Sequence, residues 1–238
     1  MKKNVILLST KTPHHFFFIN EISKNCNLSV IFENESLKPV FNVHNNFEKK
    51  QVLYEKKIWF KNRSIRISKN LNVLNVKNIN NNKTIDFIKS NNPDIIFSFG
   101  ISRLKKAFLN TVKKSIFNFH GGDTSFYRGL DSHLWSLYHN DLRGLKVTLH
   151  EVDNNLDTGK IILKKKLNLK NTKYLYQVRL LNTELCIKLA NEVIKNPNLR
   201  KMKQTKIGRY YSFMPSELKK IINIKFKKKI KFIYNDNK

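Results

Sequence analysis

Two polar side chains at the end of an apolar segment have the types and spacing needed for carbonyl chemistry. Residues 116–119 read Ile-Phe-Asn-Phe and are followed by His-Gly-Gly-Asp. Asn118 and His120 are two positions apart, so on an extended strand end both side chains lie on the same face. An amide N–H beside an imidazole can bind a carbonyl oxygen as it becomes negatively charged. The segment therefore predicts an oxyanion-stabilising site.

A second polar segment, residues 150–159, contains the carboxylate that such a site needs. Its sequence is His-Glu-Val-Asp-Asn-Asn-Leu-Asp-Thr-Gly, and Asp157 is placed to reach the same pocket. A carboxylate near His120 favours the imidazolium and can accept a proton from an attacking amine, directly or through water. Taken singly, Asn118 and His120 could merely close a strand, and Asp-Thr-Gly is an ordinary turn sequence. Their combination favours catalysis.

The surrounding pattern predicts the elements that position these residues. Short apolar runs alternate with amphipathic stretches, which is typical of a parallel sheet with crossover helices, and Asp131 is a candidate N-cap. The polar loop after residue 119 then leaves the carboxyl end of a strand, where open α/β sheets bind ligands. We expect an α/β fold with a Rossmann-like, mostly parallel sheet over residues 1–200 and a short basic C-terminal appendage over 201–238. The expected strands are 5–8, 28–32, 71–76, 95–98, 115–119, 147–152 and 160–167, and the expected helices are 14–23, 42–59, 84–90, 105–112, 131–139 and 174–194.

The two motifs together resemble the folate-dependent formyltransferase family, in its N-terminal formyl transferase domain. NFHGGDTSFYRGLD at residues 118–131 is followed by LHEVDNNLDTGKII at residues 149–162, and the resemblance covers roughly residues 90–170. Members have an Asn-x-His pair at a strand end, a Tyr-Arg-Gly type of turn and a later loop that supplies a carboxylate. The resemblance implies that Asn118, His120 and Asp157 are catalytic.

The resemblance also implies a co-substrate, N10-formyltetrahydrofolate, and the residues that bind it. The family holds the pterin largely through the backbone of the loop before the Asn-x-His strand, and a later histidine lines the pocket. A primary amine is the implied acceptor. The implied donor-binding residues are Ile101, Ser102, Arg103, Leu104, His150 and Asp153, and the implied acceptor-binding residues are Gly122, Tyr127 and Arg128.

Departures from other branches of the family narrow the acceptor. The chain has Ser-Thr-Lys-Thr-Pro-His-His at residues 9–15 instead of the Gly-rich loop of glycinamide ribonucleotide formyltransferases. Only 38 residues follow position 200, too few for the C-terminal domain of methionyl-tRNA formyltransferases. The sugar N-formyltransferases remain, and Tyr-Tyr-Ser-Phe-Met-Pro at 210–215 resembles their C-terminal region. We expect a nucleotide-linked amino sugar of surface polysaccharide biosynthesis as acceptor. The alternatives are a methionyl-tRNA formyltransferase with a reduced C-terminal region and an inactive nucleic-acid-binding module.

The composition favours a folded chain with an unusual charge. Forty-six Lys and Arg against 17 Asp and Glu give a net charge of +29, and 40% of the residues are hydrophobic, enough for a core. Only eight of the basic residues are Arg, while Asn reaches 32 and Ala only two, so we interpret the charge as compositional drift and expect nucleic acid to be an unlikely partner.

The cysteines, the lengths of the apolar segments and the C-terminal composition predict the metal content, the compartment and the oligomeric state of the protein. Two distant cysteines indicate neither a disulfide framework nor a zinc site, and we expect no metal. The N-terminal apolar run spans four residues, too few for a signal sequence, and no segment has the length of a membrane span. We expect a cytoplasmic protein. The aromatic and basic C-terminal segment favours a homodimer.

Overall fold

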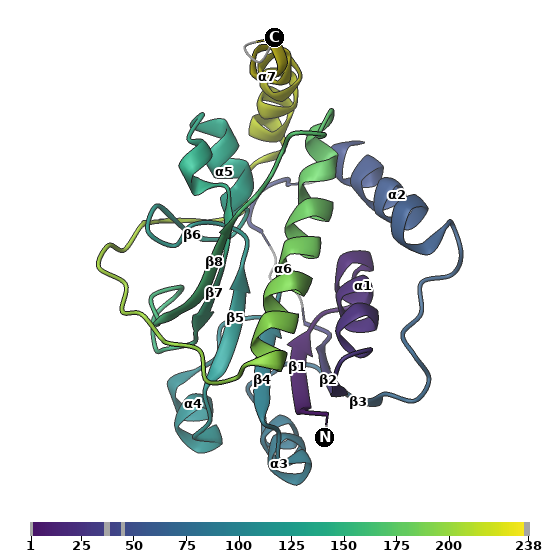
Figure 1. The fold of residues 1–238 in the computed structure, drawn as a ribbon, viewed down its shortest axis with the longest axis vertical. Coiled ribbons are helices and arrows are strands. Elements are labelled where there is room, and N and C mark those ends of the chain that lie inside the picture. The colour runs from purple at the N-terminus through teal and green to yellow at the C-terminus, as the bar shows by residue number, and fades with distance from the viewer. Residues whose placement is uncertain (1, 36–38, 44–45, 236–238) are drawn as a thin grey trace.

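A computed structural model describes residues 2–35, 39–43 and 46–235, with side chains described as far as Phe226. The lysine run at 227–229 therefore lies beyond the described side chains. In the described part, a central seven-stranded sheet has the order β3-β2-β1-β4-β5-β7-β8 (Figure 1). Its strands are β1 (Asn4–Ser9), β2 (Asn27–Glu33), β3 (Asn72–Val76), β4 (Ile95–Phe99), β5 (Ile116–His120), β7 (Lys146–Glu151) and β8 (Ile161–Lys166).

The sheet confirms the expected α/β class and shows why its strands are short apolar runs. The first five strands pair in parallel, and β7 and β8 add two antiparallel strands at the β5 edge. Residues of β1 alternate between the two faces, so Val5 and Leu7 join one core and Ile6 and Leu8 the other. Strands buried on both faces need apolar residues at nearly every position.

Helices cover both faces of the sheet (Figure 1). α6 packs on α1, and α1 on α2, on one face, while α3 and α4 pack together on the other. A third core joins α5 and α7 beyond the end of the sheet. The helices are α1 (Pro13–Ile22), α2 (Asn46–Phe60), α3 (Asn82–Asn91), α4 (Lys106–Val112), α5 (Ser132–Tyr138), α6 (Val178–Lys195) and α7 (Ser216–Asn235), with the 3-10 turns η1 (Leu142–Gly144) and η2 (Leu175–Gln177).

Two local expectations differ from the structure. The expected 174–194 helix is divided, because a separate 3-10 turn, η2, precedes α6. Asp131 stands at the N-cap of α5, but its side chain does not cap that helix. Its Oδ2 instead accepts the N–H of Met214 at 2.9 Å and lies 3.7 Å from Lys219 Nζ. The Asp131 carboxylate therefore ties the C-terminal segment to the body of the fold, a long-range contact that capping rules do not predict.

The segment after α6 packs back on the sheet domain. It forms one backbone bridge with β8, and its short strand β9 (Arg209–Tyr211) lies parallel to β6 (Tyr127–Gly129). We call residues 202–211 the C-terminal strap. Figure 1 shows this segment running around the outside of β7 and β8 before α7 begins.

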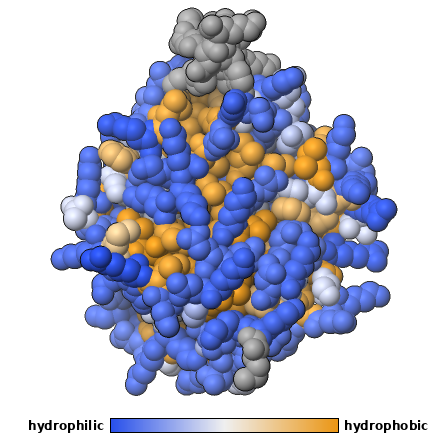
Figure 2. All heavy atoms as spheres, viewed as in Figure 1, coloured by the Kyte–Doolittle hydropathy of each residue, from blue (hydrophilic) through white to orange (hydrophobic). Residues whose placement is uncertain are grey.

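The molecular surface shows how hydrophilic residues are distributed, and the helices show whether any could cross a membrane. Hydrophilic residues are spread over the visible face, with apolar patches between them (Figure 2). In the described part of the chain, no helix combines the length and apolar character that crossing a bilayer requires.

Candidate functional site

A cleft of about 520 Å³ opens at the carboxyl ends of β4 and β5. The loop after β4, the end of β5 and the loop after β7 form its walls, which is the place the sheet topology predicts for a ligand. The cleft brings together all the residues predicted to be catalytic or to bind the donor. Its lining includes Asn118, His120, Asp157, Ile101, Ser102, Arg103, Leu104, His150 and Asp153.

The Asn118 amide is held in one orientation by its neighbours. Ser98 and Asn118 are register partners on β4 and β5, and the Ser98 hydroxyl donates to Asn118 Oδ1 at 3.0 Å. Asn118 Nδ2 lies 3.3 Å from Nε2 of His150. Because the amide oxygen is engaged by Ser98, the NH₂ group faces the cleft side of the sheet. One of its two hydrogens faces His150, and the other is available to a ligand.

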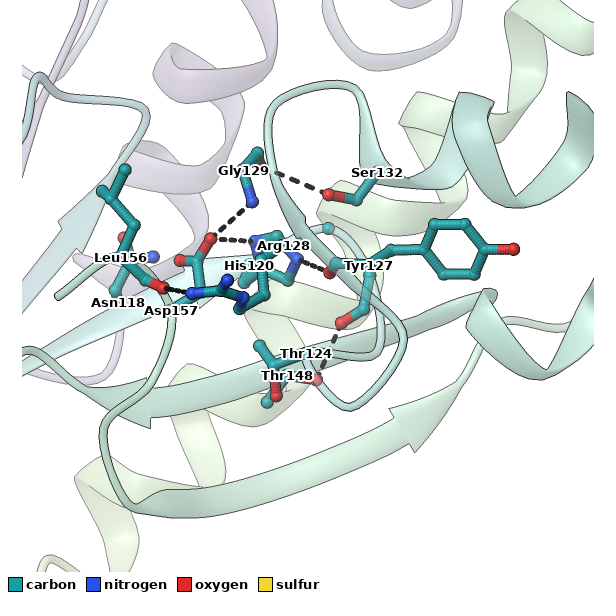
Figure 3. Close-up of polar contacts among 12 residues, drawn as sticks. Asn118, His120, Thr124, Tyr127, Arg128, Gly129, Ser132, Thr148, Leu156 and Asp157 are labelled. Atoms are coloured by element: carbon teal, nitrogen blue, oxygen red, sulfur yellow. Dashed lines mark hydrogen bonds and ion pairs between the residues drawn. The ribbon is translucent and has the colours of Figure 1, made fainter. Parts of the chain in front are cut away.

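The His120 ring is buried and fixed at both nitrogens. Its Nε2 lies 2.8 Å from the carbonyl oxygen of Tyr127, and its Nδ1 lies 3.4 Å from Asp157 Oδ2. A carbonyl can only accept, so Nε2 carries a hydrogen and donates it. Nδ1 is then the nitrogen that exchanges a proton, and it faces the carboxylate and the cleft (Figure 3).

Asp157 is the hub of the polar contacts in the cleft (Figure 3). Its Oδ1 lies 3.2 Å from His150 Nε2, and its Oδ2 accepts the Gly129 N–H at 2.7 Å. Burial by itself raises the pKa of Asp157, but the His120 charge, the His150 contact and the Gly129 hydrogen bond outweigh it and lower that pKa below its usual range. Asp157 is therefore a carboxylate at neutral pH although it is almost completely buried.

His150 links the carboxylate to the amide. Its Nδ1 lies 2.8 Å from the carbonyl oxygen of Glu151, an acceptor, so Nδ1 carries a hydrogen. Its Nε2 faces both Asn118 and Asp157. An amide donor, two imidazoles and a carboxylate thus converge in one buried corner of the cleft. Such a corner can stabilise negative charge on a carbonyl oxygen and exchange a proton beside it.

The loop predicted to bind the donor is fixed from behind by a buried carboxylate at the end of β2. Glu33 accepts the Ser102 N–H and the Ser102 hydroxyl, each at 2.7 Å, and the Ile79 N–H at 2.9 Å. Arg103 donates through its Nη2 to the carbonyl of Asn154, so this loop reaches the one after β7. Asp153 accepts from the Thr158 hydroxyl at 2.8 Å and shapes that second loop.

The opposite wall of the cleft is polar but carries little net charge. Burial lowers the pKa of three histidines in this wall, and the Arg179 charge adds to each effect. The pKa of His15 falls to about 3 and that of His133 to about 4, and the pKa of His14 is also well below its usual value. The Arg179 guanidinium makes a two-point ion pair with the fully buried Glu55, with both N–O distances at 2.7 Å. Neutral imidazoles and a paired guanidinium suit hydroxyl ligands better than anions.

None of the three residues predicted to bind the acceptor lines the cleft. The Gly122 carbonyl accepts from Thr148 at 2.7 Å, and a Cβ at Gly122 would lie 2.7 Å from Ser132 Cβ. Tyr127 stacks on His139 and Tyr211 beneath the cleft wall. The Arg128 guanidinium donates to the backbone carbonyls of Gly208 and Leu156. Their contacts place these three residues in the frame of the site, and acceptor binding by them stays a prediction.

Sequence reasoning missed several groups that complete the site. Ser98 orients Asn118, and the backbone N–H of Gly129 binds Asp157. A polar residue within the buried run Ile-Ile-Phe-Ser-Phe was a visible signal for Ser98. The wall residues His133, Arg179 and Asn182 had no comparable signal, because α5 and α6 meet the cleft only in three dimensions. Among the described residues, no three His, Cys, Asp or Glu side chains are grouped to hold a metal ion.

Comparisons with known proteins agree with this geometry. The model of one protein family, described as formyl transferase, matches residues 19–184, which is more than half of the chain. The bifunctional polymyxin resistance protein ArnA of Wigglesworthia glossinidia brevipalpis is 39% identical over 87 residues, or 36% of this chain and 13% of that protein. The methionyl-tRNA formyltransferase of Finegoldia magna is 33% identical over 103 residues, or 42% of this chain and 33% of that protein. The matches thus span a third or less of these curated relatives.

Solved structures share the fold. The formyltransferase PseJ from Anoxybacillus kamchatkensis, in complex with UDP-4,6-dideoxy-4-formamido-L-AltNAc and tetrahydrofolate, superposes with a TM-score of 0.52 at 19% identity. The superposition covers 88% of this chain and 85% of that one. With its sheet, its cleft and the long family match, the chain belongs to the formyl transferase family.

Proposed function

We propose that the protein transfers a formyl group from N10-formyltetrahydrofolate to the primary amine of a nucleotide-linked amino sugar. The observation that carries this proposal is the convergence of Asn118, His120 and Asp157 in one buried corner of the cleft. Formyl transfer to an amine needs a donor to the developing oxyanion and a group that removes the amine proton. The corner contains both.

Asn118 and His120 would stabilise the charge that develops on the formyl oxygen. The Ser98 hydroxyl holds the amide oxygen of Asn118 and so leaves an Nδ2 hydrogen for the formyl oxygen. The His120 Nδ1 contact to Asp157 is long, at 3.4 Å, so an oxygen in the cleft can share the Nδ1 hydrogen. These donors are preorganised by buried neighbours and need no rearrangement as charge develops.

Asp157 and His120 would also balance the protons of the reaction. A new C–N bond to the amine forms and the bond from the formyl carbon to N10 breaks, so one proton leaves the amine and one arrives at N10. Asp157, ionised by its neighbours, is the acceptor for the first proton. His120 Nδ1, 3.4 Å from Asp157, is placed to supply the second. No covalent bond to the protein is required.

The donor would lie against the loop after β4. When bound, it supplies the formyl carbon as the electrophile. Phe99, Ile101, Leu104 and Val152 give this end of the cleft apolar surface, which suits a flat pterin ring. Ser102, Arg103, His150 and Asp153 line the same end. Because Glu33 holds Ser102 from behind, the loop is positioned before any ligand arrives.

The acceptor would enter against the opposite wall. His14, His133, Asn182 and Thr183 offer neutral hydrogen-bonding groups there, which supports a hydroxyl-bearing ring beside the reacting amine. PseJ, which has a similar fold, is solved with a UDP-linked 4-formamido sugar and tetrahydrofolate. We place the catalytic domain at residues 1–200 and the appendage at 201–238. Dimerisation and a cytoplasmic location stay predictions from the sequence.

One assay tests both substrates. Purified protein would receive N10-formyltetrahydrofolate with amino-sugar nucleotides, glycinamide ribonucleotide or methionyl-tRNA, and tetrahydrofolate release and the formylated product would be measured. We expect turnover with an amino-sugar nucleotide. Turnover with methionyl-tRNA alone would overturn the acceptor and support the tRNA alternative. Absence of donor binding, with affinity for arbitrary duplex or tRNA that falls steeply with salt, would overturn the enzyme and support the binding module.

A further inference from the structure

The C-terminal strap, residues 202–211, is attached at several points to the loops that form the cleft corner. Met202 and Ile161 exchange two backbone hydrogen bonds of 2.8 Å, and the Gly208 N–H donates to the Thr124 carbonyl at 2.9 Å. β9 then pairs with β6, the strand that ends at Gly129. The strap therefore spans from the β8 edge to the turn that binds the Asp157 carboxylate.

Gln204 is the buried side chain of this strap, and all its hydrogen-bonding capacity faces inward. Its Nε2 donates to the carbonyl oxygens of Asp157 at 3.0 Å and Gly159 at 2.8 Å. Its Oε1 accepts from the Thr124 hydroxyl at 2.8 Å. The flanking residues Lys203 and Thr205 are exposed. Gln204 reaches the Asp157 loop through its amide hydrogens.

The Asp157 backbone has an uncommon conformation. Its φ is +56°, in the left-handed region, which Asp adopts as a single residue more readily than most residues with a Cβ. The peptide groups on both sides of its Cα are held by hydrogen bonds. Arg128 donates to the Leu156 carbonyl at 3.0 Å (Figure 3), and Gln204 donates to the Asp157 carbonyl. This conformation directs the carboxylate toward His120, His150 and the Gly129 N–H.

We propose that Gln204 is a positioning residue for Asp157: by binding the Asp157 and Gly159 carbonyls it holds the left-handed backbone that aims the carboxylate at His120. The catalytic consequence rests on the proposed function, while the positional one does not. Without the two amide hydrogens, the peptide after Asp157 is free to rotate, and the carboxylate moves away from both imidazoles.

The experiment compares Gln204→Met with Thr124→Val. Methionine keeps the length and volume of the side chain but donates no hydrogen bond, so both carbonyls lose their partner. Thr124→Val breaks the other hydrogen bond of Gln204 and leaves both carbonyl contacts in place. A merely structural Gln204 predicts that the two variants behave alike. A positioning Gln204 predicts that only Gln204→Met disturbs Asp157.

The first readout requires no substrate. The carboxyl ¹³C signal of Asp157 would be titrated by NMR, with Asp157→Asn used for assignment. In Gln204→Met the pKa of Asp157 should rise toward its usual range, because the carboxylate leaves the His120 charge and the His150 and Gly129 hydrogen bonds. In Thr124→Val it should match that of the unaltered protein. An unaltered Asp157 titration in Gln204→Met would overturn the proposal, whatever the enzyme's substrates prove to be.

The second readout is catalytic. With a substrate pair from the assay above, Gln204→Met should lower kcat by roughly 10²-fold, the scale of an ångström-sized misplacement, with KM for the donor changed less than threefold. Lys203→Ala, an exposed neighbour, is the matched control and should keep full activity. If Gln204→Met does not fold, Gln204→Asn, one methylene shorter, takes its place and should shift the Asp157 pKa in the same direction. A higher KM for the donor with an unchanged kcat would contradict a positioning role.

Discussion

Asp157 and Asp123 are both buried carboxylates, but their surroundings differ and so do their expected roles. Asp157 faces the cleft and contacts two imidazoles and a backbone N–H. Asp123 lies behind the turn, 1% exposed, with Lys146 Nζ at 2.8 Å, Lys164 Nζ in contact and the Ser125 N–H at 3.0 Å. Burial by itself raises the pKa of Asp123, but the two lysine hydrogen bonds outweigh it and lower that pKa.

The two carboxylates differ in their hydrogen-bonding partners and in whether a ligand can reach them. Lysine ammonium groups stay charged across the physiological range, so Asp123 is a fixed ion pair that holds the start of the turn against β7 and β8. The partners of Asp157 are two imidazoles and a backbone N–H, and its corner opens to a ligand. We therefore expect Asp157 to take part in chemistry and Asp123 to support the fold. The following predictions test this contrast, beginning with the largest expected effect.

Asp157→Asn should lower turnover by about 10³-fold, because the amide neither accepts the amine proton nor supports the His120 charge. Steady-state rates with the acceptor identified by the assay would measure it. The fold should be intact, as checked by circular dichroism and the thermal unfolding midpoint. Near-normal turnover would mean that the carboxylate in the cleft is not the base.

Asp123→Ala should act on stability instead. It leaves the Lys146 and Lys164 ammonium groups without a partner, and since both retain some exposure, we expect a loss at the lower end of the range for broken buried pairs, about 3 kcal/mol of unfolding free energy. Urea denaturation would measure it. A variant as stable as the unaltered protein but inactive would reverse the roles assigned to the two carboxylates.

Asn118→Ala should lower turnover by about 10²-fold, the lower end of the effect of removing one oxyanion donor. Ser98→Ala sharpens this prediction, because it frees the amide without removing it and should cost less activity than Asn118→Ala. The rate constants of the two variants under saturating substrate would show the order. Equal losses would mean that Ser98 itself contacts the substrate.

The smallest effect concerns acid stability. The pKa of Asp123 is lower in the folded than in the unfolded chain, so its contribution is complete above about pH 4 and is lost as pH falls through the folded value. Asp123→Asn should therefore lose less unfolding free energy between pH 7 and pH 3 than the unaltered protein. Urea titrations at both pH values test this. An identical loss in both proteins would mean that the Asp123 ion pair contributes nothing to acid sensitivity.

Much of the fold and of the candidate site could be predicted from local sequence. Apolar runs such as residues 5–8 and 95–98 mark strands buried on both faces, and the structure contains them as β1 and β4. The spacing of Asn118 and His120 at a strand end places both in the cleft. These are local signals, because strand periodicity and topology alone fix where they point.

The partners of many side chains could not be predicted in this way. Gly122, Tyr127 and Arg128 belong to the motif, yet each contacts a segment that is distant from it in the sequence. Asp131 has the residue type of an N-cap, but its carboxylate binds Met214, 83 positions later. A side chain's partner depends on which segments meet it, and that information is absent from short-range patterns.

By itself, then, the sequence predicted the layered α/β fold, the position of the cleft and a group of Asn118, His120 and Asp157 that the structure brings together, since hydrophobic periodicity and residue spacing act locally. Only the tertiary structure decided how these groups are oriented. Ser98 on the neighbouring strand sets the amide, and Gln204 contacts the Asp157 loop from about 45 residues away in the chain. Orientation requires contacts on several sides at once, and only the packed chain supplies them.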